Sequence, residues 1–158
     1  MAAPAGDRRR PIVVGGLLLG VGLGGFFDGV VLHQILQWHH LLSATGEHPT
    51  TTVAGLEAST LADGLFHAFA LLATLAGLIL IGVGVQREVD FSGREIAGLM
   101  LAGWGMFNLV EGIVNHQILT LHHVNGDHVV LGDVGFLLFG LVLVVGGWFL
   151  ARRSKPGR

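Results

Sequence analysis

The chain lacks cysteine and tyrosine and contains only three methionines in 158 residues. The absence of cysteine excludes disulfide bonds, thiolate metal ligands and a cysteine nucleophile. Charged residues are also scarce, at 13%, whereas 51% of the residues are hydrophobic, which suits a small membrane domain better than a soluble one. No basic patch of the kind that binds nucleic acid is present. We therefore expect the lipid bilayer, and no nucleic acid, as a partner.

Lysine and arginine are missing from two of the three loops that a membrane protein of this pattern would have. Four apolar segments, at about 11–32, 61–85, 96–119 and 129–151, each approach the ~20 residues that cross a bilayer. The basic residues lie before the first segment, between the second and third, and after the fourth, and none lies in the loops at about 41–60 and 121–128. The positive-inside rule then predicts a multi-pass protein of the cell membrane with both termini cytoplasmic.

A polar sequence occurs twice, each time at the end of an apolar segment. DGVVLHQILQWHH at 28–40 matches EGIVNHQILTLHH at 111–123, and Leu61-Ala62-Asp63 matches Leu131-Gly132-Asp133 in the segments that follow. Each half is then a pair of helices, and both pairs have the same orientation in the membrane. The pattern predicts an all-α bundle of four transmembrane helices, made of two parallel repeats related by a pseudo-two-fold axis along the membrane normal.

The repeat also suggests how the chain is divided. We expect a basic amino-terminal segment at 1–10, a first helix pair at 11–85, a cytoplasmic linker at 86–95, a second helix pair at 96–151 and a basic tail at 152–158. Glycines at four-residue spacing, at 16, 20 and 24 and again at 25 and 29, predict close helix packing.

Acidic and histidine side chains share one level of the predicted bundle. Asp28, Asp63, Glu111 and Asp133 give each apolar segment one acid in its outer half, and His33, His67 and His116 fall in the same layer. Polar groups in hydrocarbon are costly and usually functional. We therefore expect these seven side chains to converge on one site.

Helical phase refines this expectation. Asp63 and His67 are four residues apart and share a helix face. Asp28 and His33 are five apart, about 140° around an α-helix, so we expect them to reach the site from different sides. Gln34 and Gln117 are expected to form interhelical hydrogen bonds. The outer histidines are expected above the site, as an access relay or as groups that orient its ligands: His39, His40, His122 and His123.

Imidazole and carboxylate together suit Zn(II), Fe(II), Mn(II) or Cu(II), and the few methionines disfavour a Cu(I) site. The expected ligands of a mono- or dinuclear centre are His33, His67, His116, Asp28, Asp63, Glu111 and Asp133. Whether such a centre is catalytic, as in an oxidoreductase or a hydrolase, is left open.

Three other functions fit the same residues. His33 and His116 would be the axial pair of a haem b in an electron-transfer protein. Acids and histidines near the outer surface would also suit metal delivery or transport. The small-residue stripes would serve a structural assembly partner or a homo-oligomer, with the polar residues forming only a hydrogen-bond network.

The repeated pattern of acid-Gly, His-Gln-Ile-Leu and His-His, in a four-helix protein of this size, resembles a family of small prokaryotic membrane proteins catalogued only as a domain of unknown function. The resemblance covers nearly the whole chain. It implies the fold and a cell-membrane location, and it implies no chemistry.

Overall fold

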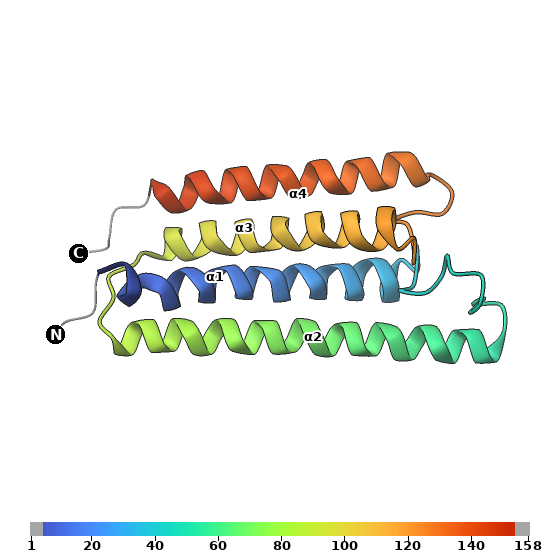
Figure 1. The fold of residues 1–158 in the computed structure, drawn as a ribbon, viewed down its shortest axis with the longest axis horizontal. Helices are drawn as coiled ribbons and strands as arrows, with labels where there is room; N and C mark the ends of the chain where they lie inside the picture. The colour runs from blue at the N-terminus through green and yellow to red at the C-terminus, as the bar shows by residue number, and fades with distance from the viewer. Residues whose placement is uncertain (1–4, 154–158) are drawn as a thin grey trace.

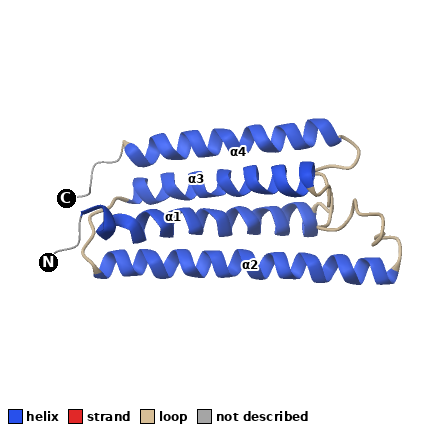
Figure 2. Ribbon diagram, in the orientation of Figure 1, coloured by secondary structure: helices blue, strands red, loops and turns tan. Residues whose placement is uncertain are grey.

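The structure, a computed structural model, describes residues 5–153 and consists there of helices and connecting loops, without strands (Figures 1 and 2). Helix α1 (Ala5–Phe27) continues into η1 (Asp28–Ile35), and α3 (Gly93–Glu111) continues into η2 (Gly112–Ile118). The remaining helices are α2 (Val53–Gln86) and α4 (Val129–Arg152). All four helical rods are long and apolar enough to span a membrane, as predicted. Residues 1–4 of the predicted amino-terminal segment and 154–158 of the predicted tail lie outside the described residues.

The helices pack in a row, with α1 and α3 in the middle (Figure 1). Helices α1 and α3 pack on each other, α2 packs on α1, and α4 packs on α3. Within residues 5–153, the helices α2 and α3, α1 and α4, and α2 and α4 do not bring their backbones close together. The helices run side by side, so the bundle has two ends along the helix axes. The start of α1, the α2–α3 loop and the end of α4 lie at one end, and the other two loops lie at the opposite end (Figure 1). The polar residues of the repeated sequence fall at this second end.

Glycine allows the central helices to approach closely. A Cβ on Gly20 would overlap the main-chain carbonyl of Met100, and a Cβ on Gly103 would overlap that of Leu17. Gly16 and Gly24 also face α3, where side chains lie against them, whereas Gly25 and Gly29 face α2. The two predicted glycine stripes therefore pack against two different helices, which confirms their role in close packing.

Helix α2 begins earlier than the sequence analysis predicts. Residues 53–60, expected in the outer loop, form its first turns, because Thr52 caps the helix and its Oγ1 accepts a hydrogen bond from the Gly55 N–H at 3.2 Å. The amino-terminal end of α2 consequently projects beyond α1 (Figure 1). Asp63 lies ten residues after Val53, more than two turns from the helix start.

Both η1 and η2 are π-helical, with backbone hydrogen bonds that span five residues instead of four. The N–H of Leu36 bonds to the carbonyl of Val31, and the N–H of Leu119 bonds to that of Val114, both at 2.8 Å. A residue with positive φ follows each segment, Gln37 at 51° and Thr120 at 48°. The chain then turns back over the helix ends, which brings the histidines of the outer loops to the bundle.

Candidate metal centre

Asp63 organises the histidines of the first half. Its Oδ1 accepts from His33 Nδ1 at 2.9 Å and from the Leu41 N–H at 2.9 Å. Its Oδ2 accepts from His40 Nδ1 at 2.7 Å and from Gln34 Nε2 at 3.2 Å. A carboxylate only accepts, so a neutral His33 donates through Nδ1 and has its lone pair on Nε2. A carboxylate that fixes an imidazole in this way is the usual partner of a metal-binding histidine.

Asp133 makes the corresponding contacts in the second half. Its Oδ2 accepts from His123 Nδ1 at 2.7 Å and from Gln117 Nε2 at 3.1 Å, and its Oδ1 accepts from the Val124 N–H at 3.1 Å. The Nδ1 of His116 lies 3.2 Å from the same Oδ1. Both glutamines thus bond to an aspartate of the neighbouring helix, as predicted.

The other nitrogen of each of these histidines faces the acid that begins its own repeated sequence. His33 Nε2 lies 3.1 Å from Asp28 Oδ2, and His116 Nε2 lies 3.1 Å from Glu111 Oε2. The expectation that Asp28 and His33 point in different directions is therefore wrong. It assumed α-helical geometry, whereas the wider turn of η1 places residues five apart on one face.

His39 and His122 lie between His33 and His116. Their rings stack with centroids 4.6 Å apart and planes inclined by 15°. His39 is 4.5 Å from the His33 ring, and His122 is 4.7 Å from the His116 ring, centroid to centroid. Both residues were expected above the site, but the loops fold back and bury them, leaving 4% of His39 and 0% of His122 exposed.

Two groups of potential ligands share His122. One consists of His33, His39 and His122, and the other of Glu111, His116 and His122; within each group the ligand atoms lie within 4.8 Å of one another. Every member is buried. Glu111 is bound closely into its group, because its Oε1 lies 2.8 Å from His122 Nε2.

The environment of His39 favours a neutral imidazole. Burial lowers the pKa of His39 to about 3, and the neighbouring His122 and His33 rings lower it as well. Its Nδ1 donates to the carbonyl of Val124 at 2.9 Å, so the lone pair lies on Nε2. This is the protonation state in which histidine binds a metal ion.

The remaining predicted ligands lie around these groups rather than in them. Asp63 and Asp133 are buried and hold histidines, as described, and Asp28 contacts His33. His67 bonds through Nδ1 to the main-chain carbonyl of Asp63 at 2.7 Å and lies against Phe26 and Gly29, away from the other imidazoles. His40 and His123 form the outer edge, with 17% and 27% of their side chains exposed.

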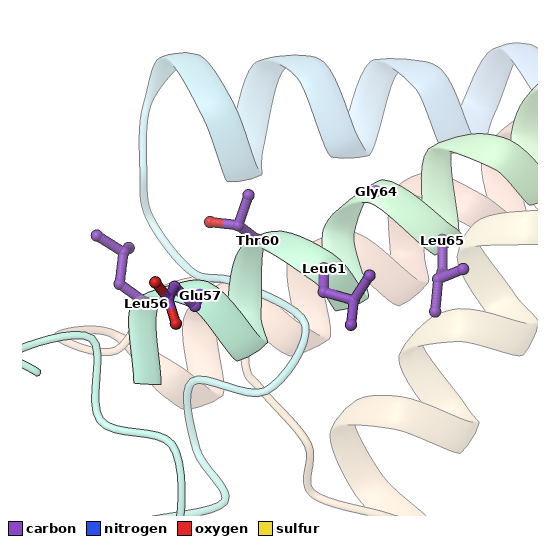
Figure 3. Close-up of a pocket in the computed structure, with 6 residues that line it drawn as sticks. All are labelled: Leu56, Glu57, Thr60, Leu61, Gly64 and Leu65. Carbon is purple, nitrogen blue, oxygen red and sulfur yellow. The ribbon is translucent and has the colours of Figure 1, made fainter. Parts of the chain in front are cut away.

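A surface hollow on α2 is separate from these histidines. Figure 3 shows it on the amino-terminal part of α2, lined by Leu56, Glu57, Thr60, Leu61, Gly64 and Leu65. Leu61 and Leu65 are exposed, whereas Asp63 of the same helix is buried toward η1. The hollow therefore belongs to the outer face of α2.

Comparison with known sequences connects most of the chain with one family. The sequence profile of the family described as "Predicted membrane protein (DUF2243)" matches residues 15–154. No curated protein and no solved structure matches the chain. The chemistry of the site must therefore be argued from its geometry.

Proposed function

The chain belongs to this family of predicted membrane proteins, and on that premise we propose that it binds transition-metal ions among His33, His39, His116, His122 and Glu111. The observation that carries the proposal is a group of buried atoms without hydrogen-bond partners. Nε2 of His39 and Nδ1 of His122 are such atoms, whereas Nε2 of His33, His116 and His122 face carboxylate oxygens of Asp28 and Glu111 at 2.8–3.1 Å without a well-aligned hydrogen bond. Leaving such atoms unpaired costs about 1–3 kcal/mol each, and a bound cation would satisfy them together.

The orientation of the imidazoles supports the same conclusion. Asp63 and Asp133 each lie against the Nδ1 side of a histidine, which leaves Nε2 of His33 facing Asp28 and Nε2 of His116 facing Glu111. Imidazole with carboxylate suits Zn(II), Cu(II), Fe(II) or Mn(II). Because His122 belongs to both groups and has two ring nitrogens, the ligand set would accommodate one ion or two.

A bound metal ion would supply Lewis-acid or redox chemistry. Asp28 stands outside both ligand groups, and its Oδ2 lies 3.1 Å from His33 Nε2. It is placed to hold a proton beside the centre. This arrangement suits an oxidoreductase or a hydrolase, in keeping with the function expected from the sequence.

The haem alternative is less compatible with the same geometry. A haem held by His33 and His116 would need the space between these residues. The stacked rings of His39 and His122 occupy it, and the Nε2 atoms of the proposed axial pair already face Asp28 and Glu111. An absorption spectrum without a Soret band from cells supplied with haem would exclude this alternative.

We further propose the pseudo-two-fold repeat and the predicted orientation in the cell membrane. The paired contacts of Asp63 and Asp133, and the position of η1 and η2 at the ends of α1 and α3, support the repeat. The arginines at the inner end support the orientation: Arg8 and Arg9 bond to main-chain carbonyls of the α2–α3 loop, both at 2.9 Å. The metal centre would then lie toward the outer surface.

Elemental analysis of detergent-purified protein tests the metal proposal. We expect stoichiometric Zn, Cu, Fe or Mn in the wild type, and loss of the metal from His39→Ala combined with His122→Ala. The matched control is His128→Ala, whose side chain is exposed at the start of α4. Metal-free wild-type protein that neither takes up an added metal ion nor gains thermal stability from it would contradict the proposal.

A further inference from the structure

A cavity of about 310 Å³ opens on the side of the helix row, beside the candidate metal centre. It lies between α2 and α3, over Val21 of α1. Its rim includes Phe69, Met106 and Val110, whose side chains are 54%, 45% and 61% exposed on membrane-spanning helices. The volume is at the lower end of the range for small-molecule sites, about 300–1,000 Å³. Because the rim residues are exposed on membrane-spanning helices, a ligand would enter from the lipid.

One part of the cavity wall is polar. Asn115 is half-buried, and its side-chain amide makes no hydrogen bond within residues 5–153. Glu111, also in the wall, is 5% exposed, and its two oxygens lie against the imidazoles of His122 and His116 at 2.8 and 3.1 Å. The repeated sequence has Leu32 where this half has Asn115, so the amide is not required by the repeated scaffold. An unpaired amide at membrane depth is costly and indicates a polar partner.

The rest of the wall is aromatic. Phe66 and Phe107 lie with ring centroids 5.9 Å apart and planes inclined by 35°. Phe66 also stacks on His33, at 5.6 Å and 18°, and so stands between the cavity and the imidazoles. Aromatic side chains favour a planar ring over an alkyl chain, because ring pairs gain about 0.5–1.5 kcal/mol beyond their buried area.

We propose that this cavity binds a membrane-dissolved phenol of the hydroquinone class, with its ring among Phe66, Phe69 and Phe107 and a hydroxyl group at Asn115. The apolar tail of such a molecule would leave the cavity toward the lipid past Val110. Binding here does not depend on the metal. That the bound molecule serves as substrate or redox partner of the centre rests on the proposed function. Glu111 and Phe66 line the cavity and also contact His122 and His33 of the centre.

Binding of tritiated decylhydroquinone, kept reduced, to purified protein tests the proposal. We expect it to bind the wild type at least ten times more tightly than decylbenzene, which lacks the hydroxyl groups, and more tightly than decanol, which lacks the ring. Asn115→Leu should weaken binding about tenfold, equivalent to about 1.4 kcal/mol. Val110→Trp should fill the cavity and abolish binding.

The matched control is Val142→Trp on α4, a lipid-facing substitution at a side chain that is 66% exposed and far from the cavity lining. Equal affinity for decylhydroquinone and decylbenzene in the wild type would overturn the proposal even if a variant failed to fold. So would decanol binding as tightly, or unchanged binding to folded Val110→Trp. Metal content and metal uptake measured on the same samples separate the two proposals. Metal-containing protein that does not bind the hydroquinone refutes only the cavity proposal, and protein that binds the hydroquinone but neither takes up an added metal ion nor gains thermal stability from it refutes only the metal proposal.

Discussion

Histidine 122 is fully buried; its Nε2 lies 2.8 Å from Glu111 Oε1, and its Nδ1 has no hydrogen-bond partner among the described residues. Its neighbours are the imidazoles of His39 and His116 and the carboxylate of Glu111. A buried nitrogen without a partner, such as this Nδ1, destabilises the fold by about 1–3 kcal/mol, which packing alone does not explain. We therefore propose His122 as a ligand of the metal ion.

The buried aspartates should control metal affinity without binding the metal themselves. In Asp63→Asn, one of the two oxygens that accept from His33 and His40 becomes an amide donor, so one imidazole loses its partner. We expect the metal affinity to fall about 10- to 100-fold, with the same result for Asp133→Asn. Competition with a chelator measures the change. Asp127→Asn, on an exposed loop, is the control, and equal affinities in all three variants would contradict the role assigned to the aspartates.

His39 should remain neutral across the physiological range. Its pKa is about 3 in the folded chain and about 6.5 in the unfolded chain. As the pH falls from 6.5 to 3, His39 gains a proton in the unfolded chain but not in the folded chain. The contribution of His39 to stability is therefore fully present above pH 6.5 and is lost as the pH falls toward 3. In metal-free protein, the ring resonances of His39, assigned by comparison with His39→Gln, should not shift between pH 5 and 8. A titration midpoint near pH 6.5 would be incompatible with the buried position.

At the scale of residues, the sequence was sufficient to identify the polar groups but not their partners. Carboxylates and histidines at the ends of apolar segments are conspicuous, and the structure buries most of them together. The central position of His39 and His122 could not be predicted, because it depends on two loops that fold back after Gln37 and Thr120. The sequence feature that pointed to these residues was the pair of adjacent histidines that ends each repeated sequence, at 39–40 and at 122–123.

The π-helical segments explain another departure from the sequence analysis. The spacing of Asp28 and His33 was interpreted with α-helical geometry, since nothing in the local sequence distinguishes the two kinds of helix. In η1 and η2 the wider turn aligns each acid with the histidine five residues later. The same acid–histidine spacing in both repeated sequences is consistent with this geometry, but spacing alone does not establish it.

The contact between α1 and α3 should be the most sensitive helix contact in the fold. In Gly103→Val the new side chain meets the main-chain carbonyl of Leu17, which cannot move without separating the two helices. Overpacking of this kind costs about 1–3 kcal/mol, and the separation would also pull apart the two halves of the candidate centre. Thermal melting and metal content in detergent measure both effects. Gly135→Val is the control, because a Cβ there meets nothing within 4 Å, and equal melting temperatures would be evidence against a tight α1–α3 contact.

At the scale of the whole molecule, hydropathy and length predicted the four membrane-spanning helices, because apolar runs of this length have few other uses. The order of the helices in the row was not predictable. It depends on which glycine stripe meets which helix, and the stripes at Gly20 and Gly25 look alike in sequence. The orientation in the membrane stays a prediction from the charges of the loops.

Cysteine labelling can test that orientation, since the chain has no cysteine of its own. We expect Glu47→Cys, in the loop between η1 and α2, to react with a membrane-impermeant maleimide in intact cells. Asp90→Cys, in the α2–α3 loop, should react only after the membrane is permeabilised. Both residues are exposed, so accessibility within the protein does not limit the reaction. The opposite labelling pattern would place the histidines on the cytoplasmic side.

The corresponding acids in the two halves of the centre, Glu111 and Asp28, differ in length by one methylene group. Glu111 reaches His116 and His122 together, whereas the shorter Asp28 reaches His33 alone. Two ions bound here would therefore have different ligands. Their affinities would differ, so one position would be occupied before the other. The lipid-facing cavity lies on the glutamate side. The two helix pairs are therefore not equivalent with respect to the lipid. A molecule that enters the cavity from the bilayer would reach the ion on the glutamate side first.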